Sequence, residues 1–154
     1  MNYSVASKYS SLAQFVFSLT SDKILLMVDY IIEEPKFSDA PIRCFKLPFT
    51  AAEALCTDTE LIRRELVGNI DTFPVLTKMF SFFRSEDMQG SSKRGLNITL
   101  GGYINKVASY WLIKEPQVVL HFIIRQNTIV SGLFNNLYLT HCVTDILIRL
   151  CTVR

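Results

Sequence analysis

The sequence predicts an all-α protein that is a fragment of a helical solenoid. Apolar residues recur every three or four positions through most of the chain, which is the spacing of one helix face. Prolines, glycines and capping residues divide these stretches at helix-like lengths. Of 154 residues, 49% are hydrophobic and only 19% are charged. This apolar balance is expected where neighbouring structure covers the ends of a helix stack.

The chain is long enough to bury a core, so we expect a single helical domain over residues 1–154. A membrane span needs roughly 18–20 consecutive apolar residues. The run ILLMVDYII has nine residues and contains Asp29, and VVLHFII has seven, so no membrane span is expected. A signal peptide is also a poor fit. Only Lys8 precedes the apolar stretch LAQFVFSL, and no small-residue cleavage site follows it.

The cysteines and the net charge narrow the compartment and the class of partner. The four cysteines are Cys44, Cys56, Cys142 and Cys151, and no two of them form a C-x-x-C motif. We expect them to be free thiols in a reducing compartment. We therefore expect the cytoplasm, with the nucleus as a second location. A net charge of +2 is too small to indicate a nucleic-acid partner. Residues 78–154 hold nine Lys/Arg and four Asp/Glu, which favours either an acidic partner or ordinary solvated faces.

Two helices are expected before the first proline. The first covers residues 7–19, with an inner face made of Leu12, Phe15, Val16 and Leu19. Ser21 is the predicted cap of the second, with Asp22 in its first turn. The apolar face of this second helix consists of Ile24, Leu25, Val28, Ile31 and Ile32. Pro35 is expected to stop it, because the residue before a proline is pushed out of the α region.

The next segment alternates connections with short helices. Three prolines in residues 35–49 predict a connection, and residues 50–56 predict a short helix. Asp58 is the expected cap of a helix that runs through Val67 and ends at Gly68 and Asn69. Asp71 is expected to cap another, with Pro74 in its first turn. The inner face of that helix is Phe73, Leu76, Phe80 and Phe83.

The segment SEDMQGSSKRG, residues 85–95, is the predicted surface loop, because glycine, serine and charge cluster there without periodicity. Either a plain insertion or a phosphorylated or partner-binding loop fits this composition. Helical spacing returns over residues 96–114, with an inner face of Leu100, Tyr103, Ile104, Val107 and Trp111.

Three further helices complete the chain. Pro116 opens the first of them, which contains VVLHFII. That short apolar run also fits a buried strand. A proline at a helix start and the lack of any partner strand pattern favour a helix. The last two helices are expected over residues 128–136 and 140–153.

A weak internal echo suggests the type of solenoid. DYIIEEP near residue 30 and SYWLIKEP near residue 110 both end an apolar-faced helix at Glu-Pro. Degenerate helix-pair repeats of the HEAT or armadillo type show such echoes. The predicted fold class is therefore an all-α, HEAT/armadillo-like helical solenoid fragment.

The final helix holds the residues that could carry chemistry. His141, Asp145 and Arg149 fall on one stripe at i, i+4 and i+8, whereas Cys142 shares the other side with apolar residues. A metal site would need ligands from elsewhere, and a nucleophilic Cys142 would need a base and an orienting group. Phosphate-binding loops, serine elbows and zinc-ligand pairs are missing from the sequence. We expect no catalytic residue, no metal and no cofactor.

The blander interpretation of the same stripe is structural. Asp145 and Arg149 form a helical i,i+4 pair worth about 0.3–0.5 kcal/mol when exposed. If the stripe faces a neighbouring helix, the pair can fix helix packing or bind a partner. The only other histidine is His121, and neither it nor Cys151 is expected to complete a metal or catalytic site with these residues.

Four segments, in the same order along the chain, resemble one family. THCVTDILIRLCT resembles the SAPS-domain signature, with matches at Asp145, Leu147, Arg149 and Leu150. FKLPFTAAEALCTD resembles an upstream segment of that family, with matches at Lys46, Pro48, Glu53 and Leu55 and with Leu47 where an aromatic residue is usual. YIIEEP and KEPQVVLHFIIRQNTIVSGLFNNL resemble the helices that precede these two segments.

The SAPS-domain family comprises regulatory subunits of type 6, Sit-type, serine/threonine protein phosphatases. The resemblance implies a helical scaffold without catalytic residues that binds a phosphatase catalytic subunit, and other regulatory proteins as well. It implies partner-binding roles for Lys46, Glu53, Asp145 and Arg149. A helical adaptor with a non-phosphatase partner remains the alternative, and a small thiol- or metal-dependent enzyme built on His141 and Cys142 is a third hypothesis.

Overall fold

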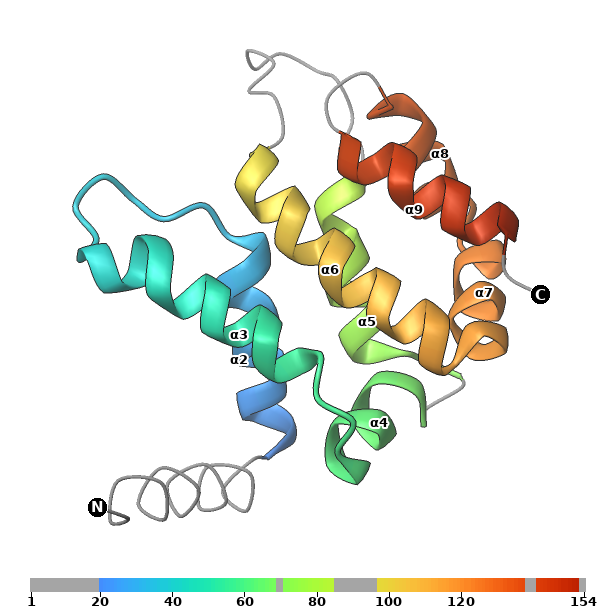
Figure 1. The fold of residues 1–154 in the computed structure, drawn as a ribbon, viewed down its shortest axis with the longest axis horizontal. Helices are drawn as coiled ribbons and strands as arrows, with labels where there is room; N and C mark the ends of the chain where they lie inside the picture. The colour runs from blue at the N-terminus through green and yellow to red at the C-terminus, as the bar shows by residue number, and fades with distance from the viewer. Residues whose placement is uncertain (1–19, 69–70, 85–96, 138–140, 153–154) are drawn as a thin grey trace, which may run out of the picture.

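The computed structural model describes residues 20–68, 71–84, 97–137 and 141–152 (Figure 1). All regular secondary structure within these ranges is helical, and they contain no strand, so the predicted all-α class is confirmed. The expected helix over residues 7–19 and the expected loop over residues 85–95 lie outside the described residues.

Helix α2 (Ser21–Ile32) has the predicted apolar face. Ile24, Val28 and Ile31 are fully or almost fully buried. Asp22 lies in the first turn, as expected, where it faces the positive end of the helix dipole. The cap prediction was wrong by one residue. Ser21 is already helical, and Thr20 takes the extended capping conformation without donating or accepting a side-chain cap bond.

The predicted connection over residues 35–49 was too long. A π-helical turn, η1 (Ile42–Lys46), follows Pro41 and continues directly into α3 (Leu47–Leu55). Pro48 therefore lies inside a continuous helical segment. The backbone N–H of Leu47 bonds to the carbonyl of Ile42, five residues back, and this wider turn accommodates a proline that has no N–H to donate.

Helix α4 (Glu60–Val67) ends at Gly68, as predicted, while Asn69 lies outside the described residues. Its cap is Thr59, whose hydroxyl accepts a hydrogen bond from the Ile62 N–H at 3.3 Å. The prediction that Asp58 caps this helix was wrong, because the Asp58 carboxylate binds side chains instead.

Helix α5 (Pro74–Phe80) and the 3₁₀ turn η2 (Ser81–Phe83) bury Leu76, Phe80 and Phe83. The fourth predicted inner residue, Phe73, is buried just before α5. Asp71 does not cap α5. The cap position belongs to Phe73, which adopts the left-handed conformation with φ 42°. Pro74 disfavours the right-handed helical conformation at Phe73. The Phe73 ring is buried edge-on against Phe122, with 5.3 Å between centroids, and this contact compensates for an unfavourable backbone.

The remaining helices follow the prediction closely. They are α6 (Ile98–Lys114), α7 (Pro116–Arg125), α8 (Asn127–Asn135) and α9 (His141–Thr152). Asn97 caps α6, because its side-chain oxygen accepts from the N–H groups of Thr99 and Leu100 at 3.0 and 3.2 Å. The helical interpretation of VVLHFII is confirmed, and the buried strand is excluded.

The helices form two layers (Figure 1). One layer contains α3, α6 and α9, which lie side by side and run in the same direction, with α3 and α9 each packed on α6. Behind it, α2 packs on α3 and α5, and α8 packs on η2 and α9. Helix α6 also packs on α2 and α7, which places it at the centre of the described helices. This arrangement is compatible with a HEAT/armadillo-like solenoid, which remains a prediction.

Candidate functional site

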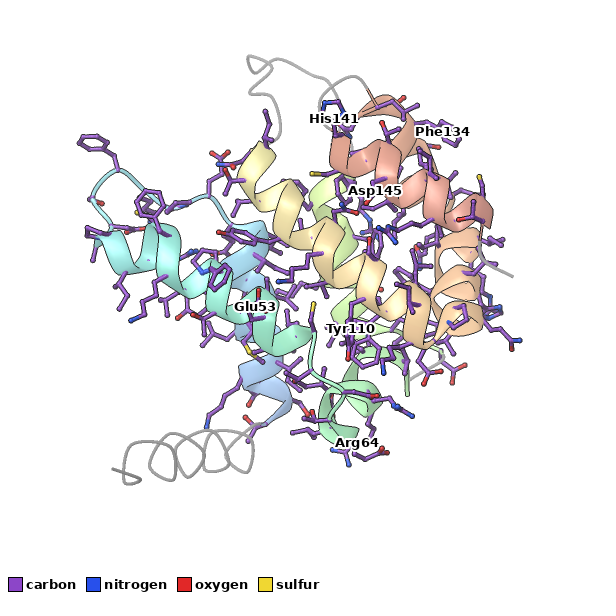
Figure 2. All side chains as sticks on the ribbon, viewed as in Figure 1. Glu53, Arg64, Tyr110, Phe134, His141 and Asp145 are labelled. Carbon is purple, nitrogen blue, oxygen red and sulfur yellow. The ribbon has the colours of Figure 1, made fainter. Side chains whose placement is uncertain are left out.

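The outer side of α3, α6 and α9 carries Glu53, Asp145 and Arg149, three of the four predicted partner-binding residues. Figure 2 shows Glu53 on α3 and Asp145 on α9, on either side of α6. We call this surface the three-helix face and define it by Glu53, Asn105, Lys106, Asp145 and Arg149. Two adjacent residues of α6 connect it, because Lys106 contacts α3 and Asn105 contacts α9.

The junction of α6 with α9 is a hydrogen-bonded set centred on Asp145. Its Oδ2 accepts from Asn105 Nδ2 at 3.0 Å and from Arg149 Nε at 3.2 Å. Ser109 Oγ lies 3.2 Å from Asn105 Oδ1 and donates to it. The hydrogen bond from Asn105, and then that from Arg149, lowers the pKa of Asp145 below its usual value. The expected i,i+4 pair is thus confirmed, and it faces the neighbouring helix.

The junction of α3 with α6 is an ion pair between Glu53 and Lys106. Lys106 Nζ donates a hydrogen bond to Glu53 Oε1, and this bond raises the pKa of Lys106. The Lys106 ammonium also lies 5.9 Å from the centre of the Phe49 ring. Lys106 and Asn105 were not predicted, because helical spacing identifies neighbours within a helix but not the opposing helix.

Lys46 stands apart from these two junctions. It is exposed at the end of η1, and its ammonium forms no hydrogen bond or ion pair with the described residues. The structure therefore joins Glu53 to α6, joins Asp145 to Arg149, and leaves Lys46 available. Partner binding by these four residues remains a prediction.

A second charged cluster lies where α3, α4 and α6 meet. Asp58 accepts from Arg63 Nη2 at 2.8 Å and from Lys114 Nζ at 3.1 Å, and Arg63 lies 3.6 Å from Glu115. The hydrogen bonds from Arg63 and Lys114 lower the pKa of Asp58. Asp58 was expected only as a cap, since Lys114 is 56 residues away and no local pattern indicates the pairing.

The histidine and cysteine side chains of α9 do not converge. His141 is exposed, and Cys142 faces α6, with its sulfur 4.0 Å from where a Cβ on Gly102 would stand. His121 is on α7, where its Nε2 lies 3.2 Å from an Arg125 nitrogen. Within the described ranges, no three His, Cys, Asp or Glu side chains are grouped closely enough to hold a metal ion.

Comparison with known proteins finds one informative similarity. The chain is 29% identical over 137 residues to the serine/threonine-protein phosphatase 6 regulatory subunit 3 of Gallus gallus. The match covers 88% of this chain and 14% of the chicken protein. No family model matches the chain, and no solved structure matches it significantly.

The chain is thus similar, over most of its length, to part of a phosphatase regulatory subunit. It spans about a seventh of the length of that relative, as the 14% coverage shows. None of the described helices is both long and apolar enough to cross a membrane.

The three-helix face is chemically suited to recognition. Its carboxylates and cations alternate across three helices, and the side chains of Glu53, Asp145 and Arg149 keep 46%, 42% and 41% of their surface exposed. Half-exposed charged pairs of this kind contribute little to folding. They can exchange partners with complementary groups on another protein, which provides specificity and register.

Proposed function

We propose that this chain is a non-catalytic regulatory scaffold that binds the catalytic subunit of a type 6-like serine/threonine protein phosphatase and directs its activity. Similarity to a phosphatase regulatory subunit over 88% of the chain is the observation that carries the proposal. In this role the chain supplies a binding surface and no catalytic group, metal or cofactor. Other regulatory proteins can join the same assembly.

The three-helix face supports this role, because it presents a rigid row of charges. Side chains held on packed helices keep their positions better than side chains on loops. In helical repeat proteins, a layer of parallel helices forms an extended binding surface. We assign phosphatase binding to this face, with Lys46 at its edge.

Binding of the purified chain to a type 6 phosphatase catalytic subunit, measured by biolayer interferometry, tests the proposal. Four variants each remove one charge from the predicted residues: Lys46→Gln, Glu53→Gln, Asp145→Asn and Arg149→Gln. Each is expected to weaken binding by about 5-fold or more, which corresponds to about 1 kcal/mol. The matched control is Arg64→Gln on α4, where the arginine side chain is 66% exposed and lies away from the three-helix face (Figure 2).

The experiment tests two hypotheses separately: that the chain binds the phosphatase, and that it does so through the three-helix face. Failure of the unaltered chain to bind would remove the phosphatase role and leave the helical adaptor with another partner as the better hypothesis. Binding that is equally strong in all five variants would keep the phosphatase and overturn the assignment to this face. Far-ultraviolet circular dichroism of each variant shows whether the fold is retained.

The same proposal places the assembly in the cytoplasm, with the nucleus as a second location. Microscopy of a fluorescently tagged chain tests the location. Exclusive localisation to a membrane-bound organelle would contradict it.

A further inference from the structure

Exposed aromatic residues concentrate on one short stretch of this protein. Ile42, Phe45 and Phe49 lie on η1 and the start of α3, and they are 53%, 73% and 54% exposed. We call these three residues the phenylalanine stripe. Phe37, in the turn just before it, is completely exposed. Single exposed apolar side chains are ordinary, but a contiguous group of them marks an interaction surface.

The helical segment that carries the stripe has apolar residues on two sides. The opposite side of this helix buries Pro48, Ala51, Ala52 and Leu55, and α3 packs there on α2. The three residues of the phenylalanine stripe, which are also apolar, are not buried by this packing. Lys106 of α6 approaches one of them, 5.9 Å from the centre of the Phe49 ring, but within the described ranges all three stay more than half exposed.

The helical segment that carries the stripe is positively charged. Between Ile42 and Phe49 the charged residues are Arg43 and Lys46, and the Lys46 ammonium is not paired with any side chain of the described residues. In the turn before this segment, the carboxylates of Glu34 and Asp39 offset the charge of Lys36. The other nearby cations are occupied. Arg43 stacks over the Tyr30 ring at 4.9 Å and lies 3.9 Å from Glu33, and Lys106 is paired with Glu53.

This charge selects among the partners that could cover the stripe. A second copy of the chain in a two-fold pairing would bring Lys46 of both copies to the same interface, and facing like charges are costly. An acidic group on a partner gains from pairing with Lys46. Since the stripe extends about 10 Å along its helix, it matches two turns of a partner helix with apolar residues at i, i+3 or i+4, and i+7.

We propose that the phenylalanine stripe binds an amphipathic helix of a partner protein, whose apolar anchors are flanked by acidic residues. This surface goes beyond the proposed function, because its recognition needs only apolar anchors and negative charge, and no phosphatase. Phe45 and Phe49 provide the apolar contact area, and Lys46 provides the charge that sets orientation.

A displayed library of helical peptides of about 16 residues tests the inference, with the complete chain as bait. Every peptide carries one stripe of leucines, and its flanking positions are filled with Glu, Lys or Ser. Peptides flanked by Glu are expected to be enriched over the other two classes. The most enriched peptide is then synthesised, and its affinity is measured by fluorescence anisotropy at near-physiological salt.

Variants of the chain locate the binding site. Phe45→Ser and Phe49→Ser are each expected to weaken binding by about 10-fold, and Lys46→Glu by about 5-fold. The matched control is Phe134→Ser, because Phe134 is 57% exposed on α8, away from the stripe (Figure 2). This control is expected to leave the affinity unchanged. All four substitutions are at exposed positions, so thermal melts are expected to show retained folding.

Several results would overturn the inference. They are enrichment of Lys-flanked peptides, enrichment of no class, and equal affinity of the phenylalanine variants and the wild-type chain. Sedimentation that shows a dimer dissolved by Phe45→Ser would assign the stripe to a second copy instead. Because the peptide experiment contains no phosphatase, its outcome is independent of the proposed function.

Discussion

Glycine is required at position 132 because of a close contact with another element, η2. A Cβ at this position would stand 2.0 Å from the carbonyl oxygen of Phe83 and 2.9 Å from its carbon. Helix α8 therefore approaches the end of η2 through a position where only hydrogen fits. Asn136 reinforces this approach, since its side-chain nitrogen donates to the Gly132 carbonyl at 2.7 Å and lies 3.4 Å from the Phe83 carbonyl.

Gly132→Ala is expected to destabilise the fold by about 2–3 kcal/mol, because backbone must move to admit one methyl group. Urea unfolding followed by circular dichroism measures the change. Gly102→Ala is the matched control. A Cβ on Gly102 would meet only the Cys142 sulfur, at 4.0 Å, so this change is expected to stabilise the helix by about 0.5–1 kcal/mol. Equal effects of the two substitutions would contradict the close approach.

The cysteines differ in reactivity for a reason that is also local. Burial raises the pKa of the Cys56 thiol from 9.0 to about 11, with nearby Lys106 acting in the opposite direction. Cys151 is exposed. Since the thiolate is the reactive form, a raised pKa keeps Cys56 protonated and unreactive near neutral pH.

Alkylation by iodoacetamide at pH 8, followed by mass spectrometry, is expected to modify Cys151 first. Because the pKa of Cys56 is about 11 rather than 9.0, its thiolate fraction at pH 8 is about 100-fold lower, and the reaction should slow accordingly. In concentrated urea the two rates should converge, because the burial is lost. Comparable rates in the folded protein would show that Cys56 is not protected.

The helices were predictable to the degree that their signals are local. Pro74, Pro116 and Gly68 mark helix ends where they were expected, and the inner face of α2 follows from its spacing. The caps were harder, because several polar residues compete at each helix start and tertiary contacts decide among them. Asp58 illustrates this, since Arg63 and Lys114 bind the carboxylate and Thr59 becomes the cap.

The candidate site was predictable in part for the same reason. The pairing of Asp145 with Arg149 follows from helical spacing, and the structure contains it. The contacts of Asn105 with Asp145 and of Lys106 with Glu53 could not be predicted, because they depend on α6 lying between α3 and α9. Pro48 misled the prediction of the connection, because a π-helical turn can carry the chain through a proline and no sequence rule locates such a turn.

The packing of α6 on α9 should depend on pH through Asp145. Its folded pKa is lowered, so the carboxylate contributes stability above its unfolded pKa of about 3.9, and this contribution is lost as the pH falls through the lower folded value. The effect is expected to be below about 1 kcal/mol, because the pair is half exposed. Thermal melts between pH 2.5 and 6 should show wild type and Asp145→Asn converging below about pH 4.

Glu34→Gln provides the control for that experiment, because Glu34 is exposed and forms no ion pair with the described residues. The difference between this variant and the wild type should stay constant over the same pH range. A constant difference for Asp145→Asn as well would contradict the role of its ionised carboxylate at the helix junction.

At the scale of the whole molecule, the described helices share one hydrophobic cluster that extends from Ile24 on α2 to Ile146 on α9. Trp111 is fully buried at its centre, and its indole N–H donates to the Leu55 carbonyl at 2.8 Å. This bond satisfies a carbonyl at the end of α3, where the helix itself offers no donor. The indole thus links α6 to the end of α3.

A continuous core predicts one cooperative unfolding transition, whereas weakly coupled helix pairs would separate in stages. Trp111 is the only tryptophan of the chain, so its fluorescence reports the junction of α3 with α6, while circular dichroism at 222 nm reports all helices. Urea curves from the two probes are expected to coincide. A fluorescence transition that precedes the loss of helix would mean that the α2–α3 pair detaches first, and it would argue against a single domain. Because the fluorescence probe lies at the junction itself, a coincident transition would mean that α3 is lost together with the rest of the stack.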